Sequence, residues 1–176
     1  MSDGKWTEAT GLLPSVETRV AISDVLTKYC TLMDRGEFEA MAEQVFTDDV
    51  IESHGEGFPD ARGRDGVAVQ FGRLMAPFEG FMHIIANIRF EPGPDDAVRT
   101  WTYFLAFHWF VESGPDPLRP ADMITTGVYE DVFVLTAEGW RIKNRKRRNV
   151  GPSPLAVGRL PSAVDFSGLG GPSSNT

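Results

Sequence analysis

Apolar residues recur every three or four positions through the first part of the chain. Between Val20 and Met33 this spacing places a continuous apolar face on one side of a helix of about twenty residues. Ser15 is a suitable N-cap, and Gly36 is a suitable place for the helix to end. The pattern therefore predicts an amphipathic first helix that buries one face.

Two shorter helices are predicted next. Residues 38–45 keep the helical period, and we expect this second helix to end at Asp48-Asp49, with Val50 entering a strand. Residues 52–63 are rich in glycine, proline and charge, which is typical of a loop. Residues 63–74 carry apolar side chains on one helical face and predict the third helix.

Beyond Pro77 the apolar period changes from 3.6 to 2, which predicts strands. In the first of them the even positions are all apolar, and the odd positions are mixed and include His83 and Asn87. The second predicted strand is apolar on both faces, so we expect both faces to be covered. The predicted strands span residues 81–90, 98–111, 124–135 and 140–149, with a hairpin turn at 137–139.

Three helices followed by at least four strands with short connections predict an α+β fold, in which an antiparallel, strongly curved sheet wraps around the helices. Residues 1–14 are expected to be a flexible leader and residues 15–150 the folded domain. Residues 151–176 form a tail rich in glycine, proline and serine, whose end is expected to be disordered.

Composition narrows the class of protein. The chain has 176 residues and 41% hydrophobic residues, which suits one globular domain. No apolar run approaches the length of a membrane span, and the first residues lack the apolar core of a secretory signal. Cys30 is the single cysteine, so an internal disulfide and a cysteine-rich zinc site are excluded. We therefore expect a cytoplasmic protein.

The net charge of −8 disfavours nucleic acid as the main partner. One segment is basic although the chain as a whole is acidic, because residues 141–148 carry six positive charges. This basic cluster suits a phosphate-bearing partner, or it is a charged strand end that pairs with acidic residues elsewhere. We favour the second interpretation.

The sequence lacks the motifs of several common classes of enzyme. It has no nucleophile elbow, phosphate-binding loop, His-Glu-x-x-His zinc motif or dinucleotide fingerprint. Glu52, His54 and Glu56 form a Glu-x-His-x-Glu string with metal-ligand spacing. Because the string lies in a glycine-rich loop, we interpret it as solvated surface and predict no metal site.

Asp34 and His83 are the strongest candidates for acid–base chemistry. Asp34 ends the first predicted helix, where the helix dipole disfavours a carboxylate. A carboxylate at this end would be explained if Asp34 oriented His83 through one ring nitrogen and left the other free as a general base. Two simpler interpretations stay open: Asp-Arg-Gly is a good turn sequence by itself, and a single strand histidine is often a hydrogen-bonded core residue.

Other residues suit supporting roles. The Tyr29 hydroxyl is a possible donor to a substrate oxygen, although its ring belongs on the apolar helix face. His108 lies on the following strand, and Arg145 could supply positive charge. Strict alternation would place Arg145 on the face opposite Trp140 and Ile142, unless a bulge intervenes. Cys30 has no activating partner in the sequence and is interpreted as inert filler.

Several segments of the chain, taken in order, together resemble the SnoaL-like branch of the nuclear transport factor 2-like superfamily. The resemblance covers residues 16–149, and its order and spacing are more specific for fold than for reaction. The segments that carry it are Ala21 to Tyr29, Met33-Asp34-Arg35-Gly36-Glu37, Val45 to Val50, Gly63-Arg64-Asp65-Gly66, His83-Ile84-Ile85-Ala86-Asn87, Gly127-Val128-Tyr129-Glu130-Asp131, Glu138-Gly139-Trp140-Arg141-Ile142 and Arg145.

The resemblance implies a cone-shaped α+β barrel with a deep apolar pocket. It extends to three enzymes of this family that use an Asp–His pair: scytalone dehydratase, hexachlorocyclohexane dehydrochlorinase and bile-acid dehydratase. It implies that Asp34 and His83 are that pair, and that Tyr29 and Arg145 match a helix tyrosine and an arginine that follows Trp-Arg-Ile. His108 resembles the second histidine of scytalone dehydratase.

The chain also departs from these relatives. Scytalone dehydratase has its helix tyrosine and aspartate adjacent, whereas Tyr29 and Asp34 are five positions apart. The bile-acid enzyme has an acidic residue near the position of His108. The candidate site is therefore a composite, which leaves the substrate open.

On this basis we expect a cofactor-independent dehydratase that acts on an apolar, ring-bearing substrate such as a polyketide or steroid. The predicted catalytic residues are His83, Asp34, Tyr29, His108 and Arg145. The predicted substrate-binding residues are Asn87, Phe104 and Tyr129. A cyclase or isomerase with the same residues, and a non-catalytic binding module, are the alternatives. The family implies a homotrimer or homodimer.

Overall fold

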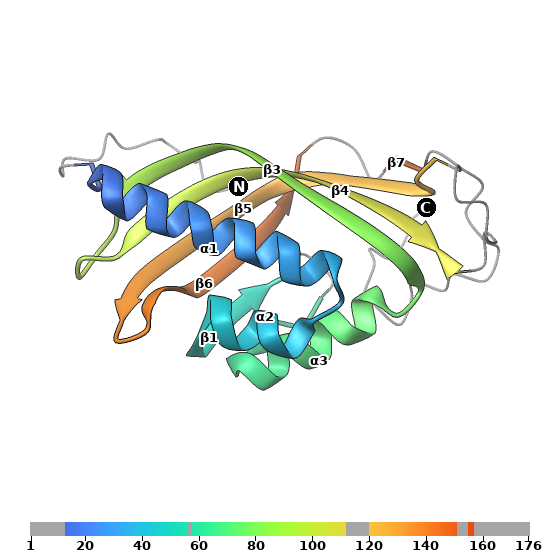
Figure 1. The fold of residues 1–176 in the computed structure, drawn as a ribbon, viewed down its shortest axis with the longest axis horizontal. Helices are drawn as coiled ribbons and strands as arrows, with labels where there is room; N and C mark the ends of the chain where they lie inside the picture. The colour runs from blue at the N-terminus through green and yellow to red at the C-terminus, as the bar shows by residue number, and fades with distance from the viewer. Residues whose placement is uncertain (1–12, 56–57, 112–119, 151–154, 157–176) are drawn as a thin grey trace, which may run out of the picture.

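A computed structural model describes residues 13–55, 58–111, 120–150 and 155–156 (Figure 1). Within them three helices precede most of a single curved sheet, so the predicted α+β class and element order are confirmed. The helices are α1 (Val16–Asp34), α2 (Phe38–Val45) and α3 (Gly63–Met75). The strands are β1 (Phe46–Ser53), β2 (Ala61–Arg62), β3 (Phe78–Pro92), β4 (Val98–Phe110), β5 (Met123–Thr136), β6 (Gly139–Asn149) and β7 (Leu155–Ala156).

The first helix begins and ends at the predicted signals. The Ser15 hydroxyl accepts a hydrogen bond from the backbone N–H of Thr18 at 3.2 Å. At the other end Gly36 adopts a φ of +70°, and its N–H donates to the Met33 carbonyl at 2.8 Å. A left-handed glycine of this kind satisfies a carbonyl that the helix leaves without a partner. The cap fixes where α1 stops and therefore where the side chain of Asp34 lies.

The strand order is β2-β1-β6-β5-β4-β3, and β7 pairs with β5 outside that path. All these pairings are antiparallel except that of β1 with β6. The sheet curves around α1, while α2 packs against α1, and α3 packs against α2 and β1 (Figure 1). The hydrophobic core fills the space between the helices and the inner face of the sheet.

The second helix is shorter than expected. It ends at Val45, and β1 begins at once at Phe46, whose backbone is extended and whose side chain is fully buried. Asp48 and Asp49 are therefore exposed residues of the strand and do not end a helix. Helical periodicity could not predict this boundary, because an apolar Phe46 fits the pattern of a helix and of a strand equally well.

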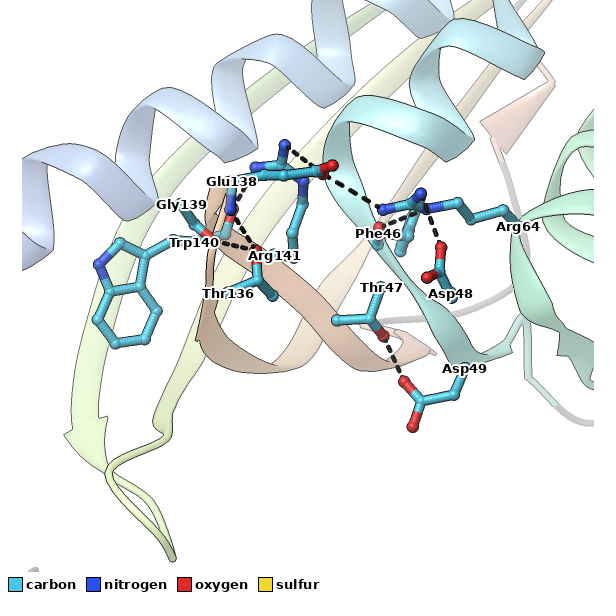
Figure 2. Close-up of polar contacts among 10 residues, drawn as sticks. All are labelled: Phe46, Thr47, Asp48, Asp49, Arg64, Thr136, Glu138, Gly139, Trp140 and Arg141. Carbon is cyan, nitrogen blue, oxygen red and sulfur yellow. Dashed lines mark hydrogen bonds and ion pairs between the residues drawn. The ribbon is translucent and has the colours of Figure 1, made fainter.

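Arg64 ties the start of α3 to this junction (Figure 2). Its Nε donates to the Phe46 carbonyl at 2.9 Å, and its Nη1 lies 2.7 Å from an Asp48 oxygen. Its Nη2 approaches Glu138, which also contacts Arg141 at 3.4 Å. One arginine thus links α3, β1 and the hairpin between β5 and β6.

The outer face of β3 and β4 is only partly covered, contrary to the expectation that both faces of the second strand are buried. Ile84 lies directly opposite Leu105, and both are more than two fifths exposed. Met82 and Tyr103 extend the same apolar surface. We call these four residues the outer apolar patch.

The basic cluster of residues 141–148 makes ion pairs within the chain, which supports the second of its two interpretations. Its partners come from β1, β5 and the β5–β6 turn. The pairs are Arg141 with Glu138, Lys143 with Asp49, Arg145 with Asp131, and Arg148 with Glu130. Of the expected leader and tail, only residues 13–14 and 155–156 lie within the described residues.

Candidate active site

Asp34 and His83 meet at the end of α1. The ring Nδ1 of His83 lies 2.7 Å from Asp34 Oδ1. The same carboxylate accepts the backbone N–H of His83 at 3.0 and 3.1 Å. These hydrogen bonds offset the unfavourable helix dipole at Asp34 and hold both residues in one arrangement.

The face of β3 that carries His83 is the inner one. Phe81 and Ile85 pack against the core on this side, while Met82 and Ile84 point outwards. The His83 side chain is only 5% exposed. Because the Asp34 carboxylate can only accept at Nδ1, that nitrogen carries the hydrogen and Nε2 is left as the proton acceptor.

Asn87 does not lie on the strand face that carries His83, and its predicted role as a substrate contact stays a prediction. An extra residue interrupts the pairing of β3 with β4 between Ala86 and Arg89. Asn87 lies in this bulge with a φ of +51° and is exposed. The bulge breaks the strict alternation on which the expectation was based.

Arg145 occupies the centre of the inner face. Its guanidinium carbon lies 4.1 Å from the centre of the Tyr29 ring and 4.2 Å from that of Tyr129. Its Nε and Nη2 donate to the two Asp131 oxygens at 2.8 and 2.7 Å. Nη1 is buried and has no hydrogen-bond partner among the described residues. Arg145 is thus fixed on three sides, with one donor group left over.

A bulge in β6 brings Arg145 inwards. Val132 pairs with Asn144 but Phe133 pairs with Ile142, so Lys143 is an extra residue in its strand. Ile142 and Arg145 are consequently both buried on the same side. The expectation that they lie on opposite faces is wrong for this reason.

Burial affects the pKa values of Tyr29 and Tyr129 more strongly than the positive charge of Arg145 does. Burial raises the pKa of Tyr29 well above its usual value, and it raises the pKa of Tyr129 to about 12 against the opposing effect of Arg145. Burial alone would lower the pKa of Arg145, but Asp131 raises it above its usual value. At neutral pH both phenols keep their hydrogens and Arg145 keeps its charge.

His108 approaches His83 from β4, with ring centres 6.2 Å apart. Burial, followed by the influence of His83, lowers the pKa of His108 to about 4. His108 is therefore neutral at neutral pH and can form hydrogen bonds but cannot offer a positive charge. Its Nδ1 is buried without a partner among the described residues.

Phe104 and Tyr129 support Arg145 from β4 and β5. Their rings stack with centres 4.3 Å apart, and Tyr129 in turn lies against the guanidinium. Phe104 covers Gly127, its partner on β5, where a side chain would collide with the ring. Phe104 is 2% exposed and holds Tyr129 in place.

Glu52 and His54 are not solvated surface, which corrects a further expectation. Glu52 belongs to β1 and is 1% exposed, and its Oε1 lies 3.3 Å from His54 Nδ1. Glu56 lies outside the described residues. No cluster of three potential metal ligands occurs within the part of the chain that the structure describes.

Asp131 and Glu52 are two buried acids near Arg145 that sequence reasoning missed. Asp131 stood within a family-like segment without an assigned role, although a buried arginine at position 145 would have required such a partner. Glu52 alternates with buried Val50 along β1, a signal that the nearby glycines obscured. The buried Cys30 thiol has its pKa raised to about 11 by burial and stays protonated.

Comparison with known proteins identifies the family of the chain. Residues 14–146 match the model of the SnoaL-like domain family, so the chain belongs to that family. No curated protein sequence matches the chain. Within the described residues no helix is long and apolar enough to cross a membrane.

Similar solved structures share the fold at low sequence identity. ActVI-ORFA from Streptomyces coelicolor is 17% identical with a TM-score of 0.66, over 76% of this chain and 98% of that one. A putative scytalone dehydratase from Novosphingobium aromaticivorans is 23% identical with a TM-score of 0.65, over 84% and 100%. A type 2 hexachlorocyclohexane dehydrochlorinase is 19% identical with a TM-score of 0.67, over 85% and 97%.

Proposed function

We propose that this protein is a cofactor-independent dehydratase acting on an apolar, ring-bearing substrate such as a polyketide or steroid. The observation that carries the proposal is the pair of His83 and Asp34, joined at 2.7 Å on the inner face of the sheet. A carboxylate-held imidazole with a free Nε2 is suited to removing a proton beside an electron-withdrawing group. The dehydratase and dehydrochlorinase named among the similar structures support elimination as the reaction type.

The reaction begins with His83. Its Nε2 takes the proton next to a carbonyl, and the electron pair of that C–H bond moves onto the carbonyl oxygen as an enolate. Asp34 stabilises the resulting imidazolium. When the enolate collapses, the C–O bond to the leaving hydroxyl breaks, and the imidazolium returns its proton to that oxygen. Water leaves, and His83 is restored.

Arg145 and Tyr29 stabilise the enolate in this proposal. The remaining Nη1 donor of Arg145 can donate to an oxygen that becomes negative. The Tyr29 hydroxyl keeps its hydrogen and is hydrogen-bonded to Tyr129, and it would redirect that hydrogen to the same oxygen. Tyr129 supports Arg145 and remains a proposed substrate contact, with Phe104 packed against it. Neutral His108 offers a hydrogen bond to the departing hydroxyl.

Proton removal can be tested before the natural substrate is known. Ring-bearing β-hydroxy ketones are incubated with the protein in D₂O without added cofactor or metal, and the products are weighed by mass spectrometry. Loss of water supports the dehydratase. Deuterium uptake without loss of water favours an isomerase or cyclase, and neither change, despite binding, favours a binding module. His83→Gln should abolish exchange, whereas Asp24→Asn, an exposed change on α1, should not.

We also propose, from the family and from the outer apolar patch, that copies of this chain associate through β3 and β4. Exposed apolar residues in one continuous patch are typical of an interface. Ile84→Glu should shift the sedimentation coefficient towards that of the monomer. Leu135→Glu, on an exposed position of β5 outside the patch, should not. A wild-type protein that sediments as a monomer contradicts this proposal.

We also propose that the protein is located in the cytoplasm.

A further inference from the structure

A second histidine–carboxylate pair lies at the end of β1, where Glu52 belongs to the strand and His54 directly follows it. His54 uses the same ring atom as His83, because its Nδ1 is 3.3 Å from Glu52 Oε1. The other Glu52 oxygen accepts from the Gln70 amide at 3.2 Å. With Nδ1 turned to Glu52, the Nε2 edge of His54 points away from the carboxylate. The His54 side chain is 14% exposed, against 1% for Glu52.

This pair faces the same side of the sheet as Arg145. Glu52 and Arg145 are direct neighbours on the parallel strands β1 and β6, and both are buried. His54 follows Glu52 by two positions, and its ring packs against Phe71 of α3 with centres 5.6 Å apart. The same Phe71 packs against Tyr29 at 6.3 Å. His54 therefore belongs to the ring cluster around the candidate site.

The two histidines approach this cluster from opposite sides. In the sheet β1 and β3 are separated by β6, β5 and β4. Tyr29 connects them through ring contacts, because its ring centre lies 6.4 Å from that of His83 and 6.3 Å from that of Phe71, which packs against His54. Burial is the main cause of the raised pKa of both Tyr29 and Asp131, and the charge of Glu52 adds to it in the same direction. The pair thus acts electrostatically on the site.

The core has no evident need for this carboxylate. Arg145 is already matched by both oxygens of Asp131, so Glu52 is not required to balance it. Burying a carboxylate is costly, and an apolar residue at this position would stabilise the fold at least as well. A buried acid that holds one nitrogen of a histidine is, however, the arrangement that fixes the direction of the other nitrogen.

We propose that His54, oriented by Glu52, binds an oxygen substituent of the substrate at the end of the site opposite His83. The site would then select ring systems that carry oxygen groups at both ends, over ring systems of the same size with one. This inference rests on the proposed function only in taking His83 as the reacting end.

Two probes of matched size test the selection. Naphthalene-2,6-diol carries oxygen at both ends and 2-naphthol at one, and the affinity of each is measured by titration calorimetry. We expect the wild type to bind the diol about tenfold more tightly, which is the effect of one hydrogen bond to an ionisable group. His54→Phe should reduce the ratio of the two affinities to about one. His54→Gln, whose amide oxygen can still accept a hydrogen bond from the probe hydroxyl, should restore part of it.

The measurement separates selection from folding and from catalysis. The thermal midpoint of each variant shows whether it folds, and a ratio of affinities is insensitive to a general loss of binding. His83→Gln should keep the ratio while it abolishes proton exchange, so a failure of the dehydratase proposal leaves this result intact. Equal affinities in the wild type, no binding of either probe at millimolar concentration, or an unchanged ratio in His54→Phe overturns the inference.

Discussion

The Asp34 carboxylate holds His83 by its backbone N–H and by its ring, across 49 positions of the chain. Asp34→Asn replaces an acceptor by a group that can also donate to Nδ1, so the hydrogen should move to Nε2. Turnover should fall about a hundredfold or more, because the base is then in the wrong tautomer. Long-range ¹H–¹⁵N spectra of the three histidines report the tautomer directly. Asp24→Asn is the matched control, and an unchanged His83 tautomer contradicts the prediction.

The ion pair between Asp131 and Arg145 should dominate the stability of the site. Asp131→Asn leaves a buried guanidinium without its counter-charge, which should lower the free energy of unfolding by about 3–5 kcal/mol. The neighbouring Glu130 pairs with a half-exposed Arg148, so Glu130→Gln should cost less than about 1 kcal/mol. Urea denaturation at pH 7 compares the two. If both variants lost the same free energy of unfolding, burial of the Asp131–Arg145 pair would add nothing to its contribution to stability.

His108 should make the fold sensitive to mild acid. Its pKa is about 4 in the folded chain, below the usual 6.5, because burial disfavours the charged ring. Between these values the unfolded chain binds a proton that the folded chain does not, so stability is complete above pH 6.5 and declines towards pH 4. The loss should be on the order of 3 kcal/mol. His108→Gln removes the titrating ring. As the pH falls from 6.5 to 4, the free energy of unfolding of this variant should therefore rise by this amount relative to that of the wild type.

Gly127 should tolerate no side chain. A Cβ at this position would lie 2.6 Å from the Phe104 ring and would also collide with the carbonyl of Arg148. Gly127→Ala should therefore destabilise the fold by about 1–3 kcal/mol and disturb the stack on Tyr129. Gly72→Ala, where a Cβ meets only ordinary contacts in α3, should be neutral or stabilising by up to about 1 kcal/mol. Thermal midpoints of both variants check this, and a neutral Gly127→Ala would show that the ring moves aside at no cost.

Part of the site could be predicted from the sequence because its positions are fixed locally. The helical period and the glycine at position 36 place Asp34 at the end of α1, and alternation places His83 on one face of β3. Neither argument says which face is inner. The apolar positions Met82 and Ile84 in fact point outwards, because the core covers the face with His83. Beyond the bulge, Ile88 and Phe90 of the same apolar set pack against the core.

The positions that sequence reasoning misplaced depend on neighbouring strands. Asn87 is turned out by a bulge against β4, and Arg145 is turned in by a bulge against β5. A bulge is set by the pairing of two strands, and neither strand alone carries its signal. Glu52 is buried because β1 lies beside β6 and beneath α3, a contact between segments far apart in the chain.

By itself, therefore, the sequence determined the order of the helices and main strands, the ends of the first helix and the family, because periodicity and capping act over a few residues. The tertiary structure decided which charges are buried together: Arg145 with Asp131 between two tyrosines, and Glu52 with His54. A buried charge is stable only beside its partner, and partners on different strands meet only once the sheet has its register.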